Sequence, residues 1–114
     1  MAKILKQGEK LILNTNIEVT NPYLTIDSFD TRKASEGECC SLTVKIWKDK
    51  ETREEAKTNK NMFPIKVESH NFNMTIDSFE DAYLAISGKL EGQDGLLDNK
   101  YPEWEDLFES NNII

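Results

Sequence analysis

The sequence contains few of the residue types that catalysis and metal binding usually require. It has one histidine, His70, and two cysteines, Cys39 and Cys40, among 114 residues. We interpret His70 as a surface residue on the outward side of a strand, which removes the Ser–His and Cys–His pairs that activate a nucleophile. Two cysteines with one histidine at this spacing also fit no zinc-ligand pattern. We therefore expect a protein that is not an enzyme and that needs no metal or cofactor.

Long apolar runs and phosphate-binding loops are missing too. No apolar run approaches the roughly 20 residues of a membrane span, so we expect no membrane partner. The first residues, MAKILKQGEKLILN, carry charges inside the apolar stretch and lack a cleavage pattern, which argues against a secretory signal. The adjacent Cys39 and Cys40 are then expected to stay reduced in a cytosol. Glu91–Gly95 has two glycines but neither the lysine nor the strand–helix setting of a phosphate loop.

Basic residues become scarce toward the end of the chain. The formal charge is −7, yet residues 1–76 hold 12 Lys/Arg and 11 Asp/Glu, whereas residues 77–114 hold 2 and 10. Phosphates need a basic face, so nucleic acid is not expected as the main partner. The acidic end is either a solvated surface or a contact for a basic neighbour. Carboxylate pairs such as Asp27 with Asp30 are interpreted as solvated faces rather than catalytic or calcium sites.

What the sequence does contain is alternation between apolar and polar residues, the pattern of half-buried strands. Residues 39–47 are the clearest case, and their inward set is expected to be Cys40, Leu42, Val44 and Ile46. Residues 10–20 predict one strand, or two short ones bent near residues 14–16. Residues 23–29 predict another strand, with Leu24 and Ile26 inward. Residues 62–72 predict a further one, with Phe63, Ile65 and Val67 inward and Pro64 at its entry.

The string TIDSF occurs twice, at Thr25–Phe29 and Thr75–Phe79. The first copy continues into polar turn residues and is expected to be a strand. The second is followed by EDAYLAISGKL, whose apolar residues recur at helical spacing, so a helix is predicted near 78–88. Asp77 or Ser78 is the expected N-cap and Gly88 the expected end. We interpret TIDSF as one string in two contexts rather than as a duplicated unit.

Three further segments are assigned from local pattern. Pro102 and the apolar stripe of Trp104, Leu107 and Phe108 predict a short C-terminal helix near 102–109, docked on the sheet or on another subunit. Residues 48–61 have one apolar residue and predict an exposed, mobile interaction loop, with Thr52 and Glu55 as a candidate capping box. Residues 1–9 are expected to form a flexible arm.

Together these features predict one α+β domain over residues 1–114. Its main part is a mainly antiparallel β-sheet of four to five strands, arranged as a sandwich or an open barrel. The helix near 78–88 and the short helix near 102–109 complete it. The chain length suits a single hydrophobic core.

The order of these segments resembles a group of small structural proteins of tailed bacteriophages. The similar features are the strands YLTIDSFDTRK and SLTVKIWKDKETREEAK, the Pro-containing strand FPIKV, the helix FEDAYLAI and the closing YPEWEDLFE. The resemblance covers roughly residues 23–109. It implies a non-enzymatic virion protein without a cofactor, associated with the tail or neck. The loop at residues 34–38 and the insert at residues 88–99 look longer than in that group.

The resemblance and the charge pattern lead to two hypotheses. The first is a homo-oligomeric ring or collar component of a phage neck or tail, located in the virion, made in the host cytoplasm, and contacting copies of itself and other virion proteins. The second is a small acidic binding module or inhibitor of a host protein. The candidate interface residues are Lys50, Thr52, Arg53, Glu55, Lys57, Lys60, Trp104, Asp106, Leu107 and Phe108.

Overall fold

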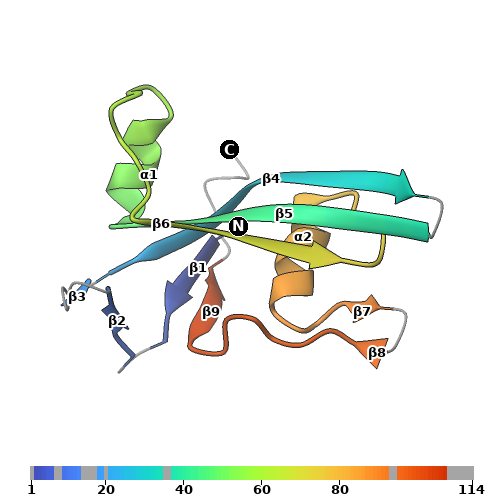
Figure 1. Ribbon diagram of the computed structural model, residues 1–114. Helices are drawn as coiled ribbons and strands as arrows, with labels where there is room; N and C mark the ends of the chain where they lie inside the picture. The colour runs from blue at the N-terminus through green and yellow to red at the C-terminus, as the bar shows by residue number, and fades with distance from the viewer. Residues whose placement is uncertain are drawn as a thin grey trace. The chain divides into compact units, whose positions relative to one another are not determined.

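The computed structural model describes residues 2–6, 9–13, 18–19, 21–34, 37–92 and 95–107. Within them the fold is α+β: a mainly antiparallel five-stranded sheet in the order β6, β5, β4, β1, β9, together with two helices (Figure 1). The predicted fold class and strand number are therefore confirmed.

The sheet strands are β1 (Ala2–Leu5), β4 (Tyr23–Ala34), β5 (Gly37–Trp47), β6 (Lys66–Phe72) and β9 (Trp104–Leu107). Two small antiparallel pairs are formed by β2 (Leu11–Ile12) with β3 (Glu18–Val19), and by β7 (Glu91–Gly92) with β8 (Gly95–Leu96). The helices are α1 (Lys50–Ala56) and α2 (Phe79–Ile86). Of the two interpretations of residues 10–20, the structure has two short strands, with residues 14–17 outside the described residues.

Where the sequence predicted a single domain, the chain forms two compact units. Unit 1 contains residues 1–25, 45–67 and 103–114, and unit 2 contains residues 26–44 and 68–102. The length of the strands accounts for this division. A strand of 12 residues, such as β4, is about 40 Å long, which exceeds the extent of one small core. Residues 23–25 of β4 belong to unit 1 and residues 26–34 to unit 2.

Unit 1 is built around a cluster of Ala2, Tyr23 and Trp47, against which Ile4 and Ala56 pack. The indole Nε1 of Trp47 is buried and donates a hydrogen bond to Thr25 Oγ1 at 3.0 Å, which satisfies its polar atom. The strand prediction for residues 39–47 placed Trp47 on the outward side, so this burial is a correction. Trp47 ends β5, where α1 and β1 supply the residues that cover it.

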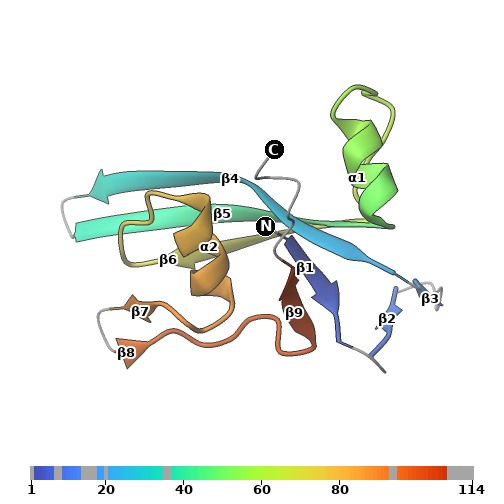
Figure 2. The same ribbon diagram turned by 180° about the vertical axis from the view of Figure 1, so that it is seen from behind.

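The first residues of the chain lie inside the sheet of unit 1. β1 pairs with β4 on one side and with β9 on the other (Figure 2), and Ala2 is fully buried. The predicted flexible arm over residues 1–9 therefore differs from the structure, in which residues 2–5 form β1. The strand has only four residues, too few for a clear alternating pattern. Its burial depends on strands that are distant in sequence, and a local pattern cannot reveal such neighbours.

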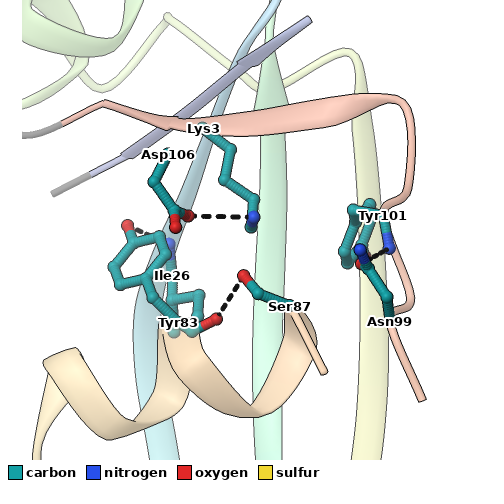
Figure 3. A network of polar contacts seen from close by, with 7 residues as sticks. All are labelled: Lys3, Ile26, Tyr83, Ser87, Asn99, Tyr101 and Asp106. Carbon is teal, nitrogen blue, oxygen red and sulfur yellow. Dashed lines mark hydrogen bonds and ion pairs between the residues drawn. The ribbon is translucent and has the colours of Figure 1, made fainter. Parts of the chain in front are cut away.

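The predicted C-terminal helix near 102–109 is wrong, because Trp104–Leu107 forms the edge strand β9. Lys3 and Asp106 lie opposite each other in the β1–β9 pairing, and Lys3 Nζ is 3.0 Å from Asp106 Oδ1 (Figure 3). The Lys3 side chain is buried at 2% exposure, and the Asp106 side chain is mostly buried at 12% exposure. A buried amine needs a nearby carboxylate, and the strand conformation supplies one. This tertiary pairing overrides the weak helical pattern.

Unit 2 is built on the inward side of β5 and on α2, which lies across the strands (Figures 1 and 2). Cys40, Leu42 and Val44 are buried as predicted. From α2, Tyr83 Oη accepts a hydrogen bond from the backbone N–H of Ile26 at 2.8 Å (Figure 3). This bond fixes the helix against β4 and satisfies a buried backbone donor.

Both ends of α2 follow the sequence prediction. Ser78 is the N-cap, and its Oγ accepts from the backbone N–H of Asp81 at 3.1 Å. After the helix, Gly88 adopts φ +72, where a Cβ would lie 2.7 Å from the backbone nitrogen of Asn99. Only glycine fits there, which explains why the helix ends at this point.

The two TIDSF copies differ as predicted, since Thr25–Phe29 lies in β4 and Phe79 of the second copy begins α2. Their final phenylalanines nevertheless meet: the rings of Phe29 and Phe79 pack edge to face with centroids 5.0 Å apart. The shared string thus contributes both halves of one aromatic contact.

The faces of β6 are the reverse of the prediction. Val67 is exposed, Glu68 and His70 are half-buried, and Phe72 is buried. The strand begins at Lys66, after Pro64, so the apolar residues before it do not set its register. A shift of one residue moves every side chain of a strand to the other face.

Candidate protein interface

The predicted interaction loop over residues 48–61 contains a helix. Asp49 caps α1, because its Oδ1 accepts from both the backbone N–H and the hydroxyl of Thr52 at 2.7 Å. The cap thus lies three residues before Thr52, and the predicted capping box of Thr52 with Glu55 is wrong. These hydrogen bonds lower the pKa of the Asp49 carboxyl below its usual value, since they favour the ionised form.

Helix α1 has no buried residue. Ala56 packs partly on the cluster of unit 1, and the Arg53 guanidinium carbon lies 5.8 Å from the centroid of the Trp47 ring. These two contacts hold one side of the helix. The rest of the α1 surface faces solvent.

The structure therefore divides the candidate interface residues. Lys50, Glu55, Lys57 and Lys60 are exposed, and Thr52 and Arg53 are half-buried. All six belong to α1 or the turn after it, in unit 1. One exposed ion pair lies on this surface, between Lys57 and Glu54 at 2.9 Å. Mixed charges on an exposed helix set orientation and partner choice more than affinity.

The C-terminal candidates do not join this surface. Trp104 is buried, and the carboxylate of Asp106 pairs with buried Lys3, so neither side chain is accessible to a partner. Leu107 pairs through its backbone with Ala2 in the sheet. Phe108 lies outside the described residues. The helical interpretation of this segment had placed Trp104, Leu107 and Phe108 on one apolar stripe, docked on the sheet or on another subunit.

Unit 1 also carries two open cavities near α1. One, of about 290 Å³, is lined by Ile4, Asn21, Tyr23 and Asp49–Glu51. The other is about 310 Å³, with Leu13, Val19 and Ile65 as its apolar lining and Glu18, Asn21, Lys48 and Asp49 as its polar lining. Cavities of this size are at the lower limit for a small ligand and can accept one large side chain.

Large apolar side chains are exposed close to the second cavity. Phe63 is 72% exposed and Val67 is 55% exposed, on either side of the cavity residue Ile65. The sequence prediction had placed both inward. Pro64, next to Phe63, indicated in the sequence that the strand begins only after this residue.

The net charge also differs between the two units. Unit 1 holds 10 Lys/Arg and 10 Asp/Glu, whereas unit 2 holds 4 and 11, so unit 2 carries the whole net charge of −7. A protein surface near neutrality does not repel a copy of itself, while a surface of one sign does.

One titratable cluster lies in unit 2. His70 Nε2 is 2.7 Å from Tyr101 Oη, which in turn donates to Glu68 Oε1 at 3.3 Å. Burial lowers the pKa of His70 below its usual value, an effect that Glu68 opposes and Lys100 adds to. Burial, followed by Glu68, raises the pKa of Tyr101. A neutral imidazole and a neutral phenol form a structural hydrogen bond here, with no activated nucleophile. His70, interpreted from the sequence as a surface residue, is therefore a packing residue.

Within the described ranges, no group of three or more His, Cys, Asp or Glu residues is arranged to hold a metal ion. No helix in the same part of the chain is long and apolar enough to cross a membrane.

No protein-family model matches the chain, and neither a curated protein nor a solved structure is detectably similar to it.

Proposed function

We propose that this chain is a non-enzymatic structural protein of a tailed bacteriophage virion. It assembles into a ring or collar of the neck or tail through contacts with copies of itself and with other virion proteins. Assembly takes place in the host cytoplasm, and neither nucleic acid nor membrane is the main partner.

The observation that carries this proposal is the exposed helix α1. Helices shorter than about 12 residues are marginal in water, and fixing each residue costs about 1–2 kcal/mol. The chain forms this seven-residue helix with an N-cap and with no residue buried. A helix that contributes so little to the hydrophobic core of its own chain leaves most of its surface available for contact with another protein. This suits a subunit whose role is assembly.

The charge pattern of α1 supports a contact that is specific in orientation. Residues 48–61 contain five basic and four acidic side chains. Ring closure needs complementary surfaces, and alternating signs can fix their register.

The experiment measures mass by light scattering after size-exclusion chromatography, and looks for rings by electron microscopy. The test variant is Lys57→Glu with Lys60→Glu, on the α1 surface. The control is Lys89→Glu with Lys100→Glu in unit 2, which changes the net charge equally. We expect rings from the wild type and the control, and a smaller, folded species from the test variant. Equal assembly of both variants, or no assembly of the wild type, contradicts the proposal.

The second candidate is a small acidic binding module that inhibits a host protein, and the observation that favours it is the net charge of −7 in unit 2. It predicts a stable monomer that forms a one-to-one complex with a basic host protein. Such a complex weakens steeply as salt rises. The control variant of the ring experiment then becomes the sensitive one, because it adds charge to unit 2.

A further inference from the structure

Unit 1 exposes an apolar side chain and an apolar cavity next to each other. Phe63 is 72% exposed, and Ile65, two residues later, lines the cavity of about 310 Å³. Two residues of chain span at most about 7 Å, so the backbone of Phe63 lies within that distance of a residue that lines the cavity. Both features are chemically alike, since Leu13, Val19 and Ile65 form the apolar part of the cavity.

An exposed apolar residue beside an apolar cavity is complementary to a copy of itself. In a twofold pair each residue i that contacts residue j is matched by residue j contacting residue i. Phe63 of one copy can enter the cavity of the second while the second copy's Phe63 enters the first. Val67, 55% exposed and four residues further along, extends the apolar area.

Charge favours a second copy over other partners on this side. Unit 1 is neutral, with equal numbers of basic and acidic residues, whereas unit 2 carries −7. Two copies that met through unit 2 would bring −7 against −7. The lining of the cavity also includes both signs of charge, with Lys48 basic and Glu18 and Asp49 acidic. A mixed lining of this kind can pair with itself.

We propose that two copies of the chain pair about a twofold axis through unit 1, with Phe63 of each copy inserted into the cavity lined by Leu13, Val19 and Ile65 of the other. This dimer is the building block of the larger assembly. The inference rests on the proposed function in taking a second copy as the partner.

Single substitutions test the two sides of the contact. Phe63→Lys alters the inserted side chain, and Val19→Glu places a carboxylate in the cavity. Each change affects both contacts of a twofold pair, so we expect the dimer to weaken at least about a hundredfold. Leu96→Lys is the control, because Leu96 is 71% exposed but belongs to unit 2. It should leave the dimer intact. Analytical ultracentrifugation from about 1 µM to about 1 mM gives the dissociation constants.

Mixing the two variants gives a sharper test. A Phe63→Lys copy retains a normal cavity, and a Val19→Glu copy retains a normal Phe63. In a mixed pair, the introduced ammonium group meets the introduced carboxylate at one contact, and an unaltered Phe63 enters an unaltered cavity at the other. With Lys57→Glu and Lys60→Glu added to both variants, so that the α1 contact of the ring is absent, we expect each variant alone to be monomeric and their equimolar mixture to form a heterodimer of twice the monomer mass. Thermal unfolding of each variant checks that it is folded.

The outcomes separate this inference from the proposed function. If the wild type assembles and Phe63→Lys assembles equally well, the Phe63 contact is wrong while the assembly role stands. If the mixture yields long alternating chains rather than a dimer, the twofold geometry is wrong. If the wild type stays monomeric over the whole range, both proposals fail. A heterodimer from the mixture supports the inference.

Discussion

The two units of this chain differ in charge and in how much of their surface is left open. Unit 2 packs α2 tightly on the strands and carries all the net charge of −7. Unit 1 is neutral, and it exposes a helix, two cavities and Phe63. Charge repulsion between two copies is therefore expected to be stronger through unit 2 than through unit 1.

The buried ion pair of unit 1 is the contact whose loss should destabilise the chain most. Lys3→Ala leaves the carboxylate of Asp106, 12% exposed, without the Lys3 ammonium group. We expect the free energy of unfolding to fall by about 3–5 kcal/mol. Urea unfolding measures this loss. The exposed pair of Lys10 with Glu18 is the control, and Lys10→Ala should not change stability measurably. Equal effects of the two substitutions would show that the Lys3 pair is not buried in solution.

In unit 2 the most sensitive backbone position is Gly88. A Cβ there would lie 2.7 Å from Asn99 N and 2.8 Å from Leu97 O, at φ +72. Gly88→Ala should lower the free energy of unfolding by at least about 2 kcal/mol. Gly95→Ala is the matched control, because Gly95 also has positive φ, +110, but no atom within 4 Å of its Cβ. Gly95→Ala should lower the free energy of unfolding by less, about 1 kcal/mol. Calorimetry measures the stability of both variants.

The N-cap of α1 allows the two units to be compared without damage to either core. Asp49→Ala removes the acceptor for Thr52, and we expect a loss of about 1 kcal/mol of helix stability. Because α1 has no buried residue, hydrogen exchange should increase in α1 and stay unchanged in unit 2. Increased exchange in α2 as well would mean that the two units unfold together.

The weakest effect that we predict is a pH dependence in unit 2. The pKa of His70 is lowered in the folded chain from its usual 6.5, so the unfolded chain binds more protons just below that pH. Stability should therefore fall as pH drops through 6.5 and level off below the folded pKa. His70→Gln should remove this part of the acid slope. Thermal unfolding from about pH 7.5 to about pH 5.5 measures it for both proteins, and an identical slope would contradict the assignment.

At alkaline pH, Tyr101 of the same cluster should make stability fall as the pH rises. The pKa of Tyr101 is raised above its usual 10.0, so above that pH the unfolded chain releases a proton that the folded chain keeps. The stabilisation from Tyr101 is thus present below the usual pKa and lost as the pH rises above it.

Elements governed by neighbouring residues were predictable from the sequence. The alternation of Cys40, Leu42 and Val44 fixes β5, and the sequence from Ser78 to Gly88 contains the cap, the apolar stripe and the stop of α2. In each case the pattern that determines the structure lies within about ten residues, so local physics decides.

Elements decided by distant partners were not predictable. β9 exists because residues 104–107 pair with residues 2–5, and the inward side of β6 is set by Tyr101, 31 residues from His70. For the candidate interface, the sequence located the exposed charged segment at Lys50–Lys60. It missed Phe63 and the cavity, because the cavity joins Leu13, Val19 and Ile65 from three separate stretches.

The pairing of Ala2 with Leu107 has a consequence for synthesis on the ribosome. β1 is made before β9 and gains this second neighbour only after residue 107 has left the exit tunnel. Until then the ammonium group of Lys3 has no Asp106 to neutralise it, so closing β1 over the core is unfavourable. A contact of such large sequence separation forms slowly. Newly made chains therefore pass through a stage in which one border of the sheet is incomplete.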